Sequence, residues 1–439
     1  MRLPRVVTPC ACVKIFFAIL IVTAVIQVII FCTKVDRPKP TVTEYEAFLD
    51  FDDPFVENRI SKRRLRPSPD VFHLNGKNLI EGHATSTNGT LLTPIELKRT
   101  LDYMNHNHMI FNLDSFGPVD KTKLVVVVQV HNRAKYLQEL IQSLQKARHI
   151  EEVLLVFSHD YSSKEINEMI SSVHFAKAMQ IFYPYSAQFT ADFCLDSYGE
   201  NMCDMHSNPN QGALARMRQH WWWKMNYVFD GIVKRYNMSN AQVMVLEEDH
   251  VVAPDFLHVF KLLDSSRKTV CPTCDMLNVG RHTRLKVLSA TLKRHGRKSA
   301  MRWWQDNMGA VFSQDLWERI RQCAQVFCNH DDYNWDFALY WVGNWCLTSP
   351  ITTLYAIGTR VFHVGDCGMH ARHCNGQETL EKTKRIYADY NASFFPESLQ
   401  FSKMHPSGYN AKKTVKYGGF DSPAAHKLCL KNTHPYNGS

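Results

Sequence analysis

The sequence lacks the signals that mark several common classes of protein. Lys and Arg residues give a formal net charge of +9, but they are scattered, and no basic stripe or known nucleic-acid motif accompanies them. The GxGxxG fingerprint of dinucleotide-binding folds is absent, which argues against a hydride-transfer cofactor. No internal repeat is visible. We therefore expect no nucleic-acid partner, and a mildly basic surface around an anionic ligand accounts for the charge.

Charged residues are also absent from one long apolar run, residues 15–32. At about 1.5 Å per residue, this run roughly spans the hydrocarbon core of a bilayer. A cleaved signal peptide is the alternative, but the run is long for one and lacks a convincing small-x-small cleavage site. Basic residues flank it on both sides, so the positive-inside rule favours a cytoplasmic N-terminus only weakly. We expect a single-pass type II membrane protein with a cytoplasmic tail (1–14) and a signal anchor (15–32).

The cysteines point to an oxidising compartment. Three of the 13 cysteines lie in or beside the apolar run, and the others form an even set, which suits a lumenal disulfide framework. Cys271 and Cys274 could be half of a zinc site, but a second CxxC or CxxH is missing, so a local disulfide is favoured. Glycosylation sequons support a lumenal body. They begin at Asn88, Asn237, Asn391 and, at the chain end, Asn437.

A polar segment separates the apolar run from the rest of the chain. Residues 33–95 carry many charges, Pro and Thr, and no sustained apolar period, which is typical of a stem. A helix-like stretch at 94–106 leads into the remainder. With 439 residues, 45% of them hydrophobic, the chain can bury a large core. We expect a lumenal stem at 33–95 and a single lumenal globular domain at 96–439.

The globular part begins with alternating strands and helices. Residues 124–130 form a continuous apolar run of the kind that is buried on both faces of a parallel sheet, and a helical period follows at 136–147. This order predicts an α/β fold with a Rossmann-like start, in which nucleotides bind at the carboxyl ends of the strands. Further strands are expected at 153–159, 179–183 and 242–246, with helices at 164–173, 210–234 and 255–264.

The expected helix at 210–234 carries three consecutive tryptophans, Trp221, Trp222 and Trp223. Three neighbouring residues cannot share one face of a helix. We therefore expect core packing for at least two of them, while another could face a sugar ring.

Acidic residues follow the expected strand at 242–246. Glu247, Glu248 and Asp249 would lie at the carboxyl edge of the sheet, where a hard divalent cation can bridge carboxylates to a diphosphate, as in a DxD motif. Such a strand end is more often a solvated turn. We expect Asp249 to be the direct ligand, with Glu247 or Glu248 serving the nucleotide or supporting the ligand. His363 is more often a satisfied polar group than a ligand, but near Asp249 it would complete a set suited to Mn²⁺.

The segment 331–336, DDYNWD, combines three carboxylates with two aromatic side chains that can shield a carboxylate from water. Such a carboxylate can take the proton from an acceptor hydroxyl. Helix N-capping is the alternative, and we expect it for at least one of Asp331 and Asp332. Asp336, which follows the aromatic residues, is the better candidate for the base.

Together these motifs resemble the N-acetylglucosaminyltransferase II family over about residues 120–430. The resemblance implies a GT-A type, Rossmann-like fold that binds nucleotide sugars, with 96–439 as its catalytic domain. It also implies inverting transfer of GlcNAc from UDP-GlcNAc to O2 of the α-1,6-arm mannose of N-glycan acceptors, in β-1,2 linkage, at the Golgi membrane. The matching blocks are LVVVVQVHNR, VLLVFSHD, QHWWWK, EEDHVVAPDFLHVF, NMG at Asn307, CNHDDYNWDF and VFHVGDCGMH.

The resemblance further implies roles for single residues. Asp249 and His363 would bind Mn²⁺, and Asp336 would be the catalytic base. Arg284 would contact the donor, although Arg281 stays open as the alternative because the stretch around them matches poorly. The other donor contacts would be Gln129, Val130, His131, Asn132, Arg133, Asp160, Arg216, Met217, Arg218, Gln219 and His220. The disulfide pairs would be Cys194–Cys203, Cys271–Cys274, Cys323–Cys346, Cys328–Cys429 and Cys367–Cys374.

Three other functions stay open from the sequence. A sister GlcNAc-transferase that acts on the other mannose arm would share the donor chemistry. A catalytically dead, lectin-like Golgi protein would need neither metal nor base, and a zinc-binding structural protein is the weakest alternative. The sequence does not define an oligomeric state.

Overall fold

The computed structural model describes residues 93–186, 188, 209–302, 306–365, 375–402 and 418–436, all of them within one unit of the chain, Leu74–Ser439. The expected cytoplasmic tail and signal anchor lie outside the described residues, as does the expected stem before residue 93. Within the described ranges, no helix combines the length and the apolar character needed to cross a membrane.

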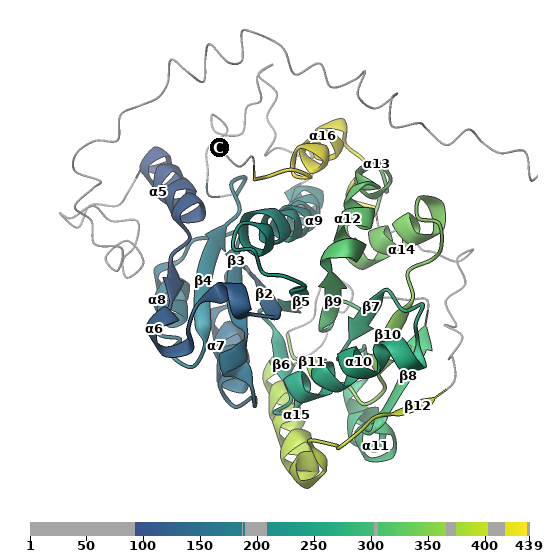
Figure 1. Cartoon of the computed structure of the whole chain (residues 1–439). Helices are drawn as coiled ribbons and strands as arrows, with labels where there is room; N and C mark the ends of the chain where they lie inside the picture. The colour runs from purple at the N-terminus through teal and green to yellow at the C-terminus, as the bar shows by residue number, and fades with distance from the viewer. Residues whose placement is uncertain are drawn as a thin grey trace, which may run out of the picture. The chain divides into compact units, whose positions relative to one another are not determined.

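A mixed sheet runs through the described part of the chain (Figure 1). Among the described residues it has ten strands, in the order β1-β4-β3-β2-β5-β9-β7-β10-β8-β12. The strand bounds are β1 Ile110–Phe111, β2 Leu124–Val130, β3 Leu154–His159, β4 Lys177–Phe182, β5 Gln242–Glu247, β7 Met276–Asn278, β8 Lys298–Arg302, β9 Ala310–Ser313, β10 Thr353–Ala356 and β12 Gln400–Ser402.

One half of this sheet is parallel. β3 and β5 flank β2 and run parallel to it, and β4 runs parallel to β3. The chain builds β2, β3 and β4 in one direction, then returns through α9 (Pro209–Tyr227) and adds β5 on the other side of β2. Such a reversal of strand order opens a crevice at the carboxyl ends of the two strands beside it, here β2 and β5. The predicted α/β fold with a Rossmann-like start is confirmed.

The other half is mainly antiparallel and was not predicted. β9 runs antiparallel to both β5 and β7, and β8 runs antiparallel to β10. β10 is parallel to β7, and β12 is parallel to β8. These strands have only three to five residues, which is too short for periodicity to separate them from other apolar segments.

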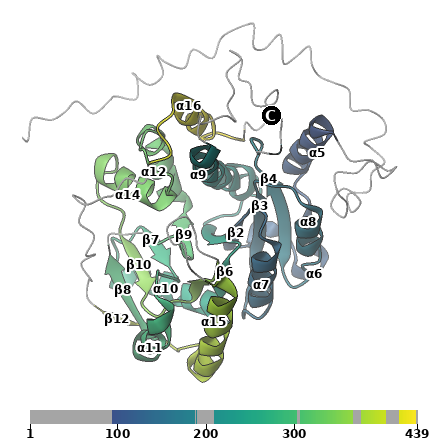
Figure 2. The ribbon, with the colours of Figure 1, turned by 180° about the vertical axis from the view of Figure 1, so that it is seen from behind.

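Helices cover both faces of the sheet. Alternate residues of the parallel strands, such as Val125 and Val126, point to opposite faces and enter two separate cores. α9, α12, α13, α14 and α16 pack on one core, and α7, α8 and α10 pack on the other. Figure 2 shows α9, α12, α14 and α16 gathered apart from α7. The remaining helix bounds are α5 Pro94–Asn107, α6 Leu113–Phe116, α7 Ala134–Gln145, α8 Lys164–Ser171, α10 Phe256–Val270, α11 Leu285–His295, α12 Gln314–Arg321, α13 Ala324–Cys328, α14 Trp335–Trp345, α15 Gly376–Tyr390 and α16 Pro423–Lys431.

The tryptophans of α9 all belong to the core. Residues 221–223 are 0%, 0% and 2% exposed, so none of them is free to face a sugar. The Trp221 ring stacks on Trp335 with the centroids 4.3 Å apart, and the Trp222 ring stacks on Phe327 at 4.2 Å. The first contact fixes the start of α14 against α9, and the second fixes α13 against it.

Three disulfides join cysteines of the described residues: Cys271–Cys274, Cys323–Cys346 and Cys328–Cys429. They confirm three of the five pairs that the resemblance implied, and the other two pairs lie outside the described residues. The bond between Cys271 and Cys274 rules out the zinc alternative for this CxxC. Cys328–Cys429 joins α13 to α16 across a sequence separation of 101 residues.

Candidate active site

The candidate active site lies where the carboxyl ends of β2 and β5 meet. Gln129 of β2 pairs with Glu247 of β5 in the parallel ladder, and the Glu248 amide continues the ladder by donating to the Gln129 carbonyl at 3.0 Å. Polar segments leave both strands at this point. One leads to Arg133 and the other to Asp249.

A second, two-stranded sheet brings His363, which is distant in the sequence, to the carboxyl ends of β2 and β5. β6 (His250–Val252) pairs antiparallel with β11 (Val361–His363), and the register sets His363 opposite His250. Asp249, one residue before β6, is thereby placed beside His363. The Val364 amide adds a hydrogen bond of 2.9 Å to the Asp249 carbonyl.

Asp249 is buried and faces two cationic side chains. Its Oδ2 lies 2.9 Å from His363 Nε2 and 2.7 Å from Arg133 Nη1. Burial opposes the charge, but the hydrogen bond from His363 and the charges of His363 and Arg133 hold the pKa of Asp249 well below its usual value. The carboxylate is therefore ionised at neutral pH, as a metal ligand must be. Burial lowers the pKa of His363, yet the hydrogen bond to Asp249 and the charges of Asp249 and Glu247 together raise that pKa overall.

The residues around Asp249 fit a divalent metal ion. Asp249 Oδ1 is buried and has no hydrogen-bond partner within the described ranges, and such an oxygen costs free energy unless a donor or an ion meets it. Ligand atoms of Glu247, Asp249 and His250 lie within 4.8 Å of one another. Burial lowers the pKa of His250 to about 3, so its ring is neutral, and its Nδ1 accepts a 3.1 Å hydrogen bond from the Glu247 amide. Carboxylate and imidazole together suit a cation such as Mn²⁺.

Gly365 leaves the space that Asp249 needs. A Cβ atom added at Gly365 would collide with Asp249 Oδ2 and lie 3.1 Å from Asp249 Cβ. The segment after β11 passes this close to the carboxylate only because residue 365 has no side chain.

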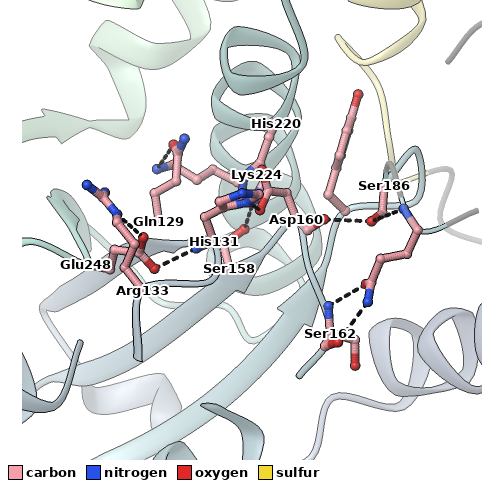
Figure 3. A network of polar contacts seen from close by, with 12 residues as sticks. Gln129, His131, Arg133, Ser158, Asp160, Ser162, Ser186, His220, Lys224 and Glu248 are labelled. Carbon is pink, nitrogen blue, oxygen red and sulfur yellow. Dashed lines mark hydrogen bonds and ion pairs between the residues drawn. The ribbon is translucent and has the colours of Figure 1, made fainter. Parts of the chain in front are cut away.

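Glu248 anchors the segment that follows β2. It is buried, and its carboxylate accepts hydrogen bonds from Arg133 Nε at 2.6 Å and from the His131 amide at 2.7 Å (Figure 3). Burial raises the pKa of Glu248, while the charge of Arg133 opposes that rise. The sequence left open whether Glu247 or Glu248 supports the metal ligand. In the structure Glu248 bonds to the segment after β2, and Glu247 lies beside Asp249.

Asp160 follows β3 and lies among histidines (Figure 3). Its Oδ1 is 2.6 Å from His131 Nδ1, and its Oδ2 is 4.0 Å from His220 Nδ1. Ser158 Oγ holds the other ring nitrogen of His220 at 2.8 Å. Burial opposes ionisation of Asp160, but the hydrogen bond from His131 lowers its pKa, and the same bond raises the pKa of His131. Asp160 and the exposed His131 form a polar pair at the carboxyl ends of β2 and β3.

Lys224 is part of the site although the sequence analysis did not select it. It is fully buried, and its Nζ donates to Gln129 Oε1 at 2.7 Å (Figure 3). Burial lowers the pKa of Lys224 to about 7, against the charges of Glu247 and Asp160. The sequence feature that could have identified Lys224 is its spacing from His220, since residues four positions apart lie on the same face of a helix.

Asp336 lies in the first turn of α14. Burial raises its pKa to about 8, and the carboxylates of Asp306, Asp332 and Glu247 add to this rise. Glu247 belongs to the Asp249 cluster, so the charge of that cluster acts on the pKa of Asp336. A carboxyl group with a pKa near the working pH is suited to take up a proton.

Neither Asp331 nor Asp332 caps a helix, so the capping prediction is wrong. The N-cap residue of α14 is Asn334. Asp332 Oδ1 accepts hydrogen bonds of 2.9 Å from the amide and the side chain of Asn334. Asp331 Oδ1 accepts a 3.0 Å hydrogen bond from the Phe420 amide, so this acid holds the C-terminal segment instead.

A model of the family N-acetylglucosaminyltransferase II (MGAT2) matches residues 98–429 of the chain. The chain belongs to this family. It is therefore a glycosyltransferase, and its Rossmann-like sheet is of the GT-A type that the resemblance implied.

Curated relatives carry the name alpha-1,6-mannosyl-glycoprotein 2-beta-N-acetylglucosaminyltransferase. The protein of Rattus norvegicus is 34% identical over 355 residues, which cover 75% of this chain and 79% of the relative. The protein of Homo sapiens is 32% identical over 357 residues, covering 75% and 78%. Among solved structures, S. aureus TarS 1-349 in complex with UDP-GlcNAc aligns with a TM-score of 0.29 and 12% identity, over 60% of this chain and 65% of that one. The mannosyltransferase PcManGT from Pyrobaculum calidifontis, in complex with GDP-Man and Mn²⁺, has a TM-score of 0.29 and 11% identity, over 69% and 84%.

The donor contacts that the N-acetylglucosaminyltransferase II resemblance implied on α9 divide into two groups. His220 reaches the Asp160 cluster, Arg216 is half-buried, and Met217 is 37% exposed. Arg218, by contrast, is 1% exposed. Its guanidinium donates to three backbone carbonyls, those of Phe327, His330 and Asp332.

Arg218 and Gln219 anchor α9 to the C-terminal part of the chain. The Arg218 guanidinium carbon lies 4.0 Å from the centroid of the Phe420 ring, and Gln219 Nε2 donates to the Ala425 carbonyl at 2.5 Å. Both side chains face away from the Asp160 cluster because consecutive helical residues point in different directions. The structure therefore gives these two residues a packing role, and their predicted contact with the donor stays a prediction.

The remaining predicted donor contacts lie at the end of β2 and in the segment before α11. Val130 is buried, and its carbonyl accepts from the Asp160 amide at 3.2 Å, whereas Asn132 is exposed. Arg284 is exposed at the N-cap of α11, and Arg281 is half-buried with its guanidinium carbon 5.8 Å from the Tyr355 ring centroid. Which arginine contacts the donor stays a prediction.

Proposed function

We propose that this chain transfers N-acetylglucosamine from UDP-GlcNAc to O2 of the α-1,6-arm mannose of N-glycans, in β-1,2 linkage and with inversion. The observation that carries the proposal is the buried cluster around Asp249 at the carboxyl ends of β2 and β5, in a member of the N-acetylglucosaminyltransferase II family. The curated relatives named for this activity support the same acceptor arm.

Asp249 and His363 would hold Mn²⁺, with Glu247 and His250 near enough to share in the site. When bound, the ion supplies positive charge that stabilises the departing diphosphate. Arg133 Nη1 lies 2.7 Å from Asp249 Oδ2, so its guanidinium is also placed to meet anionic oxygens at this position. The polar pair of Asp160 and His131 is suited to bind the hydroxyl groups of a ribose.

Asp336 is the proposed base. Its ionised carboxylate accepts the proton of the mannose O2 hydroxyl, the oxygen attacks the anomeric carbon of the donor, and UDP leaves from the opposite face. This single displacement inverts the anomeric configuration without an enzyme nucleophile. The stack of Trp221 on Trp335 holds the first turn of α14 in place, which fixes the position of Asp336.

We further propose a Golgi location with the globular part in the lumen. The apolar run at 15–32 is suited to be a type II anchor. The three disulfides require an oxidising compartment.

The test is an incubation of the full chain with UDP-GlcNAc and two defined N-glycans that offer either the α-1,6 or the α-1,3 mannose arm. We expect a β-1,2-linked GlcNAc on the α-1,6 arm only, and no product after chelation of divalent metals. Product on the α-1,3 arm would point to the sister transferase. UDP-GlcNAc binding without any turnover would point to a lectin-like protein.

A further inference from the structure

A cavity of about 940 Å³ lies at the other end of the parallel strands. Leu124, Val153 and Gln242, at or beside the amino-terminal ends of β2, β3 and β5, are part of its lining. Because these strands are parallel, their amino ends face away from the edge that carries Asp249 and Asp160. No residue of the candidate active site lines this cavity.

A buried cation lies in the lining. Lys177 begins β4 and is 4% exposed. Within the described ranges its Nζ has one hydrogen bond, donated to the Phe116 carbonyl at 3.2 Å. An ammonium group carries three donor protons, so two of them remain for a ligand.

Thr122 brings a second unsatisfied group to the same cavity. It is 3% exposed and is part of the lining. Its Oγ1 is buried and has no hydrogen-bond partner in the part of the chain that the structure describes. A buried hydroxyl without a partner costs free energy, so a ligand that bonds to Thr122 would recover that cost.

The charges along the cavity favour an anion. Among the acids in its lining, Glu152 pairs with Lys261 at 2.7 Å, and Asp264 lies 3.8 Å from Arg267. Glu151 is then the one acid in the lining without a cationic side chain in an ion pair, as far as the described residues go. Against it stand three lysines that form no ion pair with a carboxylate of the described residues: Lys121, Lys123 and Lys177.

We propose that this cavity binds a small, soluble phosphate ester. Lys177 Nζ and Thr122 Oγ1 donate hydrogen bonds to the phosphate oxygens, and the buried side chains of Leu257 and Phe260 contact the carbon part of the ligand. The volume lies within the roughly 300–1,000 Å³ that is usual for small-molecule sites. This site is separate from the transferase site and does not depend on the proposed activity.

The probes are inorganic phosphate and glycerol 3-phosphate, titrated calorimetrically into the full chain in buffer that contains EDTA. We expect saturable binding at one site. Lys177→Met keeps the buried stem and removes the charge, and Thr122→Val replaces only the hydroxyl. Each variant should bind about tenfold or more weakly, because each loses a hydrogen bond to a charged ligand. Both variants should keep the wild-type rate of GlcNAc transfer.

Two controls make the outcome decisive. Lys293→Met removes an exposed lysine that is not part of the lining, and Asp249→Ala alters the transferase site; both should bind phosphate as the wild type does. Equal binding by wild type and Lys177→Met, or loss of binding in Asp249→Ala, would overturn the proposal. If Lys177→Met does not fold, unchanged binding in Thr122→Val overturns it. Acetate that binds as tightly as phosphate would refute the ligand class.

Discussion

Two carboxyl groups of the candidate site have pKa values shifted in opposite directions. Asp249 is held ionised, against its burial, by the hydrogen bond and charge of His363 and by Arg133. Asp336 faces burial and neighbouring carboxylates, which raise its pKa to about 8. Such a separation assigns different roles to the two acids. Asp249 suits a permanent anion for a metal, and Asp336 suits a group that exchanges a proton.

Asp336→Asn should lower transfer about a hundredfold to ten-thousandfold, the usual range for a positioned base. The amide has almost the same size but cannot accept the proton. UDP binding should change little. The measurements are steady-state transfer and UDP titration. Asp331→Asn is the control, since Asp331 bonds to the Phe420 amide, and it should lose stability more than turnover. Normal turnover in Asp336→Asn would move the base to another acid of the 331–336 segment.

The same substitution should change how stability depends on pH. The pKa of Asp336 is raised from 3.8 to about 8 in the folded chain, so between these values the native state keeps a proton that the unfolded state releases. This group therefore makes the free energy of unfolding fall as pH rises from about 4 to about 8. Asp336→Asn removes this dependence, and its stability relative to wild type should increase with pH across that window. Denaturation at about pH 5, 6.5 and 8 without metal tests this expectation, and a constant difference would contradict it.

At the scale of secondary-structure elements, the sequence predicted what local patterns encode. β2 and β3 are apolar along their length because both faces are buried, so their runs were visible. The pairing of β6 with β11 joins residues more than a hundred positions apart, and no local pattern specifies such a contact. The place of His363 beside Asp249 came from the family resemblance alone. The burial of Arg218 against three backbone carbonyls was not visible in the sequence, because a motif does not say which way a side chain points.

Gly365→Ala should weaken metal binding without unfolding the chain. The added methyl group would collide with Asp249 Oδ2 and displace the carboxylate from its position between β6 and β11. We expect the Mn²⁺ concentration for half-maximal transfer to rise about tenfold, equivalent to about 1.4 kcal/mol. Gly231→Ala is the control, because its nearest contact is a Tyr436 side-chain atom at 3.2 Å. An unchanged Mn²⁺ requirement in Gly365→Ala would remove Asp249 from the metal site.

Arg218→Lys should destabilise the chain and leave the donor affinity intact. Lysine cannot reproduce the planar fork that donates to three carbonyls, so buried oxygens lose partners at a cost of about 1–3 kcal/mol each. Urea unfolding measures the loss, and UDP titration of the folded protein measures the affinity. A large fall in UDP affinity with unchanged stability would contradict this expectation and show that Arg218 contacts the donor.

At the scale of the whole folded unit, the site draws on segments from β2 near residue 130 to β11 at His363, and the proposed base lies on α14 near residue 336. α9 packs against α14 and is tied to the C-terminal part of the chain by Arg218 and Gln219. The disulfide Cys328–Cys429 reinforces this connection by joining α13 to α16. The C-terminal helix therefore contributes to the position of the base, although it supplies no predicted site residue.

Loss of Cys328–Cys429 should destabilise the chain more than loss of Cys271–Cys274. Their sequence separations are 101 and 3 residues. In the chain-entropy account, a cross-link over about 100 residues contributes about 4.7 kcal/mol, and a very short one about 3 kcal/mol less. Replacing each pair by two serines and comparing urea unfolding gives the difference directly. The Cys328 and Cys429 double variant should also lose transfer before it unfolds globally, because release of α16 loosens the support of α9 and α14. Equal losses of stability in the two double variants would show that loop entropy does not govern this framework.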